Sequence, residues 1–220
     1  MESGINTEPS INIKSSIAAE HIAQSLQSGD WSIREVDGLT LAHSPLLSAQ
    51  PGLVHAFTTR HGGDTPAPFD SFNLGRSVGD ESVKVKALEN RRRLCQVLGI
   101  NHDNLQVPGQ VHSGNVVLVE HPDKPSRAAS PELSGVDGLY TSCRQLPLLL
   151  HFADCVPVLV YEKNLKLLSI VHAGWRGTAQ GIAATAVDRL LSKGGNVQDM
   201  VAAVGPAIGP CCYPTGDDVV

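Results

Sequence analysis

The chain of 220 residues lacks any apolar run long enough to cross a membrane and lacks blocks of basic residues. A membrane-spanning helix needs about 20 predominantly apolar residues, so we expect no membrane partner. The net charge of −5 at pH 7 argues against nucleic acid as a main partner, because phosphate backbones bind basic surfaces. One short basic run, Arg91 to Arg93, is interpreted as a solvated helix face with ion pairs.

The N-terminus lacks the apolar segment with basic flanks that marks a secretion signal. The five cysteines are odd in number and form no CxxC pair. We therefore predict a reducing, cytoplasmic setting, in which cysteines act as metal ligands, nucleophiles or core residues. We assign Cys95 to the core, Cys143 to no functional role, and the adjacent Cys211 and Cys212 to a loop that lines the site.

Residues 1–30 are predicted to form an N-terminal extension with one short amphipathic helix, and residues 31–220 a single catalytic domain. In the first part of that domain, apolar patterning predicts strands over 31–36, 39–43 and 53–59. A loop rich in Gly, Pro and Asp follows from residue 60 to 79. A helix is then expected between Asp80, which is a good N-cap, and Gly99, which is a typical stop.

The second half has the stronger apolar patterning. Strand pieces are predicted within 107–119, 146–152, 156–161, 165–171 and 200–204, with a surface loop over 121–135. A helix is expected from Thr178 to about Lys193, ended by Gly194 and Gly195. Strands and helices mix without strict alternation, which predicts an α+β fold: a single layered domain with mixed β-sheets flanked by helices.

Three short segments each carry a strong metal-ligand side chain at the edge of a predicted strand: His112, Cys155 and His172. Cys155 and His172 flank one predicted strand pair, so a hairpin would bring them to the same end of a sheet. His112 would join them from another strand end. Two imidazoles and one thiolate suit zinc or copper, and three protein ligands leave one coordination position open. The pattern predicts a catalytic metal centre.

Seven segments resemble one known family, in that family's order. They are Phe57-Thr58-Thr59-Arg60-His61-Gly62-Gly63, Phe72-Asn73-Leu74-Gly75, Gln110-Val111-His112, Asp137-Gly138-Leu139, Ala153-Asp154-Cys155-Val156-Pro157, His172-Ala173-Gly174-Trp175-Arg176-Gly177 and Gly205-Pro206-Ala207-Ile208-Gly209-Pro210-Cys211-Cys212-Tyr213. The family is the YfiH-type purine nucleoside phosphorylases, long labelled "laccase domain" or multicopper polyphenol oxidases. The resemblance implies a YfiH-like fold, a single Zn²⁺ held by His112, Cys155 and His172 with copper as a substitute, and purine nucleosides and inorganic phosphate as partners.

The resemblance also has two departures. After Tyr213 the chain has Pro214-Thr215-Gly216, where the family typically has Glu-Val-Gly. Family members usually continue for several elements beyond the position of Val220. The catalytic domain is therefore expected to be truncated at its C-terminus. The oligomeric state is left open.

Phosphorolysis needs an anion cradle, and the resemblance directs attention to the segment that begins at Arg60. A guanidinium binds phosphate in a bidentate way, and glycines such as Gly62 and Gly63 let the main chain approach closely. His61 and Arg176 are further candidate contacts for phosphate or substrate. Asp154, beside Cys155, is predicted to be catalytic. For it three roles stay open: proton transfer, orientation of a histidine ligand, and capping of a turn.

The implied activity is phosphorolysis of adenosine, inosine or S-methyl-5′-thioadenosine, with adenosine deamination as an additional activity. One alternative is a metal-free cysteine hydrolase or deamidase, in which His172 activates Cys155 as a nucleophile. Another is copper-dependent oxidation of phenols, as the older family label implies. A multicopper oxidase needs many histidine ligands, and the chain has nine histidines in total and no His-x-His pair. A last alternative is a metal-binding fragment without catalytic activity.

Overall fold

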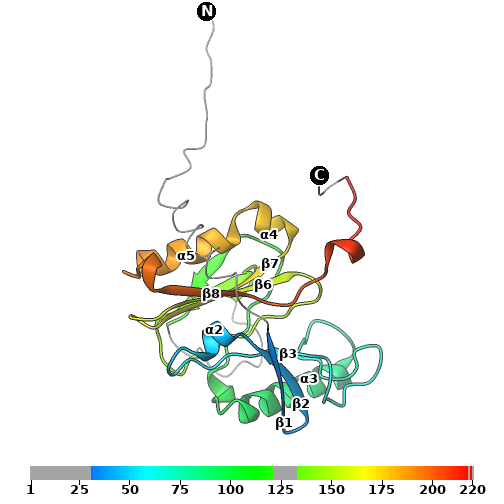
Figure 1. The fold of residues 1–220 in the computed structure, drawn as a ribbon. Helices are drawn as coiled ribbons and strands as arrows, with labels where there is room; N and C mark the ends of the chain where they lie inside the picture. Colours follow the sequence, from blue (N-terminus) through cyan, green and yellow to red (C-terminus); the bar gives the residue numbers. More distant parts are fainter. Residues whose placement is uncertain (1–30, 121–132, 218, 220) are drawn as a thin grey trace, which may run out of the picture.

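The computed structural model describes residues 31–120, 133–217 and 219, and Figure 1 shows their arrangement. The predicted N-terminal extension and most of the predicted loop over 121–135 lie outside the described residues. Two β-sheets and their helices form the described fold, which confirms the predicted α+β class. Among the helices in these ranges, none has the length and apolar character that a membrane span requires.

The smaller sheet consists of three antiparallel strands in the order β1-β2-β3. They are β1 (Ser32–Val36), β2 (Leu39–His43) and β3 (Phe57–Thr58). The predicted strand over 53–59 is therefore reduced to two residues. A short helix that the sequence analysis did not predict, α2 (Pro45–Ser48), follows β2. Ser44 caps it by accepting from the Leu47 N–H, and Pro45 occupies the first turn, where its missing N–H is harmless.

The long helix of the first half, α3 (Glu81–Val97), confirms the helix predicted between Asp80 and Gly99. Asp80 is its N-cap, because its side chain accepts from the Val83 N–H. The apolar stripe of α3 packs on β2, and Cys95 is buried there as predicted.

The larger sheet has five strands in the order β4-β5-β7-β6-β8. They are β4 (Val116–Leu118), β5 (Gly138–Thr141), β6 (Val156–Glu162), β7 (Leu167–Ala173) and β8 (Met200–Val204). Only the β4–β5 pair is parallel, and the other three pairs are antiparallel. β6, β7 and β8 confirm predicted strands, whereas β5 was not predicted.

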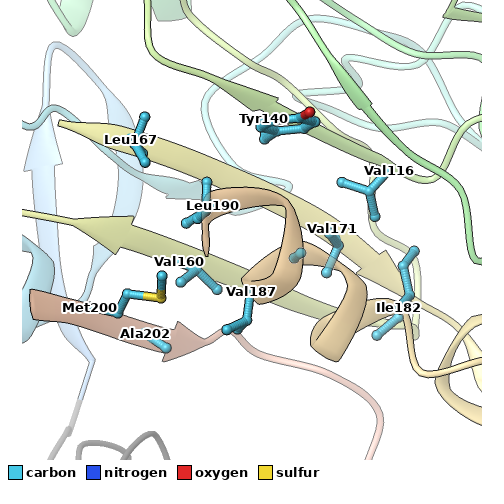
Figure 2. Close-up of a cluster of buried hydrophobic side chains, with 12 residues drawn as sticks. Val116, Tyr140, Val160, Leu167, Val171, Ile182, Val187, Leu190, Met200 and Ala202 are labelled. Carbon is cyan, nitrogen blue, oxygen red and sulfur yellow. The ribbon is translucent and has the colours of Figure 1, made fainter. Parts of the chain in front are cut away.

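Side-chain alternation along β7 divides the core into two layers. Leu167 and Val171 point to the face covered by α5 (Ile182–Ser192), where the cluster in Figure 2 lies. Leu168 and Ile170 belong to clusters on the opposite face. His172 has the same parity as those two residues, so it projects from the face opposite α5.

Two predicted elements after residue 106 differ from the structure. The run 146–152 forms no strand, and only Leu148 makes an isolated bridge with Gln106. The run is rich in leucine because this irregular segment buries the side chains of Leu146, Leu149 and Leu150 in the core. Likewise, the segment from 107 to 113 is irregular and β4 supplies the only strand of the predicted pair among the described residues.

The helix expected from Thr178 begins earlier and is broken in two. A five-residue helix, α4 (Trp175–Ala179), starts directly after β7 with Gly174 as its N-cap. Gly181 then separates α4 from α5 with a left-handed φ of 73°, a conformation that glycine adopts without strain. The chain leaves α5 at Gly194, as predicted.

Arg91 does not lie on a solvated face, which corrects the interpretation of the basic run. Its side chain is buried, its Nε donates to the Leu74 carbonyl at 2.7 Å, and Nη2 lies 3.2 Å from His151 Nε2. Burial, together with the charge of Arg76, lowers the pKa of Arg91 to about 10. Arg93 also donates to backbone carbonyls, those of Gly62 and Asp37. Only Arg92 of the three is exposed.

Candidate metal centre

The three predicted ligands meet in the structure. One ligand atom from each of His112, Cys155 and His172 can be chosen so that all lie within 4.8 Å of one another. The β6–β7 hairpin brings two of them together, because Val156 pairs with Ala173 and Pro157 with His172. Cys155 immediately precedes β6, so it lies at the same end of the sheet as His172. The hairpin predicted from the spacing is confirmed.

His112 comes from the irregular segment before β4. Its ring lies 4.9 Å from the ring of His172, edge to face. Its φ is +63°, an uncommon conformation for a residue with a side chain. Asp154, on the loop that carries Cys155, also has a positive φ, of 72°. Positive φ values at side-chain-bearing residues cluster at functional sites.

Asp137 links two of the ligands, and the sequence analysis did not assign it this role. Its Oδ1 lies 2.9 Å from His172 Nδ1, which leaves Nε2 as the ring nitrogen available for a metal. For His172 this orienting contact therefore comes from Asp137, and the three roles considered for Asp154 stay predictions. Burial by itself would raise the pKa of Asp137, but hydrogen bonds from Ser113, Val111 and His172 outweigh it and the pKa is lowered. The available signal was an aspartate placed directly before Gly138 at the start of a core strand.

Gly174 leaves the space that the three ligands share. A Cβ at this position would lie 3.0 Å from His112 Cδ2, 3.2 Å from Cys155 Sγ and 3.7 Å from His172 Cε1. The φ of Gly174 is −71°, an ordinary value for any residue. Glycine is therefore favoured here by space next to the ligands and not by backbone conformation.

The donor set fits a transition-metal ion. Burial raises the pKa of the Cys155 thiol, and the carboxylates of Asp154 and Asp137 raise it further. A thiol in such surroundings needs a cation to become a thiolate, and a coordinated metal ion supplies one. Two imidazoles and one thiolate are soft and borderline ligands of the kind that zinc and copper prefer.

An open pocket of about 310 Å³ adjoins the ligands. It is lined by Phe57, Phe152, Asp154, Pro206, Ala207 and Ile208. The Phe152 ring lies 5.7 Å from the His172 ring and 6.0 Å from the Phe57 ring of β3. Phe152 therefore connects His172 to the smaller sheet through ring contacts. The Ile208 N–H donates to the Asp154 carbonyl at 3.0 Å, which fixes one wall of the pocket against the Cys155 loop.

The sequence profile of a protein family described as multi-copper polyphenol oxidoreductase laccase matches residues 54–220. The chain belongs to this family. The purine nucleoside phosphorylase YlmD of Geobacillus stearothermophilus is 41% identical over 172 residues, which cover 77% of this chain and 62% of the relative. The adenosine deaminase RL5, from an unknown prokaryotic organism, is 34% identical over 170 residues, covering 76% and 64% of the two chains. The chain thus spans a little over 60% of the length of these relatives.

The solved structures agree with the family and with the predicted YfiH-like fold. The crystal structure of YlmD from Geobacillus stearothermophilus superposes with a TM-score of 0.76 at 36% identity, covering 88% of this chain and 70% of that one. The YfiH structure from Bacillus licheniformis gives a TM-score of 0.75, also at 36% identity. The resemblance inferred from the seven segments is therefore confirmed.

Arg60, the family residue expected to bind phosphate, lies just after β3 and is engaged by an acid. Its Nη2 contacts Asp70 Oδ2 at 2.6 Å, and its Nε donates to the Asp70 carbonyl at 3.1 Å. His61 is exposed on the same turn. Gly62 and Gly63 are needed for packing, because Cβ atoms there would lie 2.2 Å from the Gly38 carbonyl oxygen and 2.1 Å from that of Ser71. Their role toward phosphate stays a prediction.

Arg176, Cys211 and Cys212 are exposed, whereas Cys143 is part-buried. The Arg176 guanidinium stacks over the Trp175 ring, with its carbon 4.1 Å from the ring centroid. Cys211 and Cys212 are exposed, with their Sγ atoms 3.4 Å apart and no disulfide. Neither cysteine belongs to the metal-ligand group found in the described residues. Cys143 contacts the Glu120 carbonyl through its Sγ at 2.8 Å.

Proposed function

We propose that the chain is a zinc-dependent purine nucleoside phosphorylase, with adenosine, inosine and S-methyl-5′-thioadenosine as the substrates. The convergence of His112, Cys155 and His172 beside an aromatic-lined pocket carries this proposal. The name of the relative from Geobacillus stearothermophilus supports the substrate class. The match covers 62% of that relative, so the activity named for the full-length relative is a proposal for this chain.

The pocket suits a purine nucleoside. Phe57, Phe152 and Ile208 offer an apolar surface on which a flat base can stack. Asp154 brings a carboxylate to the same pocket, from which it can accept a hydrogen bond from the base or the ribose. The base would then lie next to the metal ligands, because Phe152 contacts His172.

Phosphorolysis requires that a phosphate oxygen bond to C1′ of the ribose while the C1′–N9 bond breaks. The electron pair of that bond leaves with the base, which takes up a proton, and ribose-1-phosphate is the second product. A zinc ion held by His112, Cys155 and His172 would supply Lewis-acid stabilisation of negative charge. We propose that Arg60 binds and orients phosphate with His61 and the Gly62–Gly63 turn, and that Arg176 contributes positive charge. Asp154 is proposed to move a proton in the pocket.

Adenosine deamination is a second candidate function, favoured by the 34% identical adenosine deaminase RL5. In this reaction water adds at C6 of the base and ammonia leaves, so that inosine forms without phosphate. The same pocket and Asp154 would bind the substrate. The two activities are separated by their requirement for phosphate.

Two other functions have less support. A metal-free cysteine nucleophile needs a thiol of lowered pKa, whereas burial and nearby carboxylates raise the pKa of Cys155. A multicopper oxidase needs several metal sites, and the described residues contain a single group of three or more ligand side chains. Copper binding at that one group is a separate question, which metal analysis answers.

The deciding experiment incubates purified protein of measured metal content with adenosine and inosine, with and without inorganic phosphate. Chromatography resolves bases, nucleosides and ribose-1-phosphate. Free base that forms only with phosphate, in proportion to bound zinc, is the expected result. Conversion of adenosine to inosine without phosphate supports the deaminase function instead. Bound zinc with no turnover of either substrate overturns both functions for this chain.

A further inference from the structure

Asp137 is fully buried, and its carboxylate contacts five polar groups from four residues around the metal centre. Oδ1 accepts from the His112 N–H at 3.0 Å and contacts His172 Nδ1 at 2.9 Å. Oδ2 accepts from the Val111 N–H at 3.1 Å, the Ser113 N–H at 2.6 Å and the Ser113 hydroxyl at 2.9 Å. The two oxygens therefore have different partners: Oδ1 contacts both histidine ligands, and Oδ2 contacts the residues beside His112.

The arrangement explains the unusual backbone of His112. Three successive N–H groups, those of Val111, His112 and Ser113, point at one carboxylate. Successive N–H groups converge on one point when a left-handed residue occurs among right-handed or turn residues, and such a concavity binds anions. The positive φ of His112 provides that residue. Asp137 thus acts as an internal anion that holds His112 in its left-handed conformation.

We infer that Asp137 is a positioning residue that assembles the metal centre before metal binds, by fixing the backbone of His112 and the ring of His172 through one carboxylate. This inference rests on the metal centre of the proposed function. A carboxylate at His172 Nδ1 keeps the proton on Nδ1 and leaves Nε2 unprotonated toward the metal. Because both histidines depend on Asp137, their positions are coupled although 60 residues separate them along the chain.

The carboxylate is required because both of its oxygens accept hydrogen bonds, whereas an amide of the same shape has only one oxygen. In Asp137→Asn one carboxylate oxygen becomes an amide nitrogen, which donates and does not accept. If that nitrogen takes the place of Oδ2, two N–H groups and the Ser113 hydroxyl lose their acceptor or face another donor. If it takes the place of Oδ1, it donates to His172 Nδ1 and drives the ring proton to Nε2. The substitution therefore weakens metal binding in either orientation.

The test compares zinc affinity in the full chain and in Asp137→Asn by competition with a chromophoric chelator. The visible absorption of Co²⁺-loaded protein reports thiolate coordination and ligand geometry. Ser113→Ala is the matched control, because it removes one hydrogen bond to Oδ2 and leaves both contacts of Oδ1. We expect Asp137→Asn to bind zinc about 10–100-fold more weakly and to alter the Co²⁺ spectrum, with a smaller effect in Ser113→Ala.

The outcomes separate this inference from the proposed function. If the unmodified chain binds no zinc, the proposed metal centre fails. If it binds zinc and Asp137→Asn binds equally well with the same Co²⁺ spectrum, the role of Asp137 is overturned. Should Asp137→Asn not fold, ¹⁵N spectra of the metal-free unmodified chain decide. A proton on His172 Nδ1 is the expected result, and an unprotonated Nδ1 overturns the inference.

Discussion

The Arg60 guanidinium is bound on two sides by Asp70: Nη2 contacts the carboxylate at 2.6 Å, and Nε donates to the main-chain carbonyl at 3.1 Å. Both side chains are largely exposed, at 65% and 47% of their surface. Exposed ion pairs contribute about 0–1 kcal/mol, so phosphate can displace this carboxylate at modest cost. Asp70 therefore competes with the anion that Arg60 is proposed to bind.

The first prediction concerns this competition. Asp70→Asn removes the competing charge and should lower the KM for phosphate, by at most about fivefold because the pair is exposed. Arg60→Ala should raise the KM for phosphate. Initial rates of inosine phosphorolysis over a range of phosphate concentrations measure both changes.

Asp64→Asn is the matched control for Asp70→Asn. Asp64 also forms an exposed pair, with Lys86 at 2.7 Å, so its removal changes the net charge equally. It should leave the KM for phosphate unchanged. An unchanged phosphate KM in Arg60→Ala would show that Arg60 does not bind the anion.

The second prediction concerns the thiolate ligand. Cys155→Ser replaces a soft sulfur by a hydroxyl, which is a much poorer ligand for zinc or copper. Bound metal and turnover should be lost together, and chelation of metal from the unmodified chain should have the same effect. Elemental analysis and the phosphorolysis assay measure the two quantities.

Cys143→Ser, in a cysteine outside the ligand group, serves as the control. Full activity of metal-free Cys155→Ser would contradict a catalytic role for the metal.

Local signals in the sequence predicted much of the fold and the meeting of Cys155 with His172, whereas the family resemblance implied that His112 joins them. The β6–β7 hairpin follows from two apolar runs on either side of a turn, and its register brings Cys155 and His172 together. The α3 helix follows from its cap at Asp80 and its apolar stripe. Both elements depend on contacts between residues close in the chain, and such contacts leave a periodic pattern.

The parts that were missed depend on distant contacts. Asp137 orients His172 from 35 residues away, and its place before Gly138 in a family segment does not by itself reveal that contact. The buried run after Leu146 has the composition of a strand, but Pro147 and the neighbouring chain hold it in an irregular path. Arg91 lies in a basic run that is typical of a solvent-exposed helix face, yet its side chain is buried and donates to the Leu74 carbonyl.

The third prediction concerns space at the metal centre. Gly174→Ala would place a Cβ 3.0 Å from His112 Cδ2 and 3.2 Å from Cys155 Sγ, so the ligands must shift by a few tenths of an ångström. Metal ligands tolerate such shifts poorly, and we expect weaker zinc binding with little change in the melting temperature of the metal-free chain. Gly109→Ala is the control, because its Cβ would meet ordinary contacts of 3.6 Å or more. Equal zinc affinity in both variants would show that Gly174 does not limit the site.

The fourth prediction concerns acid stability. Burial, together with the nearby His43, lowers the pKa of His55 from 6.5 to about 4, where its Nε2 accepts from the Ser44 N–H at 2.9 Å. Burial, together with the charge of Arg91, lowers the pKa of His151 to about 4 as well. Between these values the unfolded chain binds protons that the native chain excludes, so stability must fall as the pH drops from 6.5 toward 4.

Each of these histidines should contribute a slope of up to about 1.4 kcal/mol per pH unit in that window. Urea denaturation at several pH values measures the slope. His55→Gln keeps an acceptor near the Ser44 N–H but cannot be protonated, so the slope should decrease by the contribution of one histidine. His61→Gln, at an exposed position outside the core, should leave it unchanged. A free energy of unfolding that stays constant from pH 7 to 5 would contradict the assignment. It would mean that the native chain binds as many protons as the unfolded chain in this range.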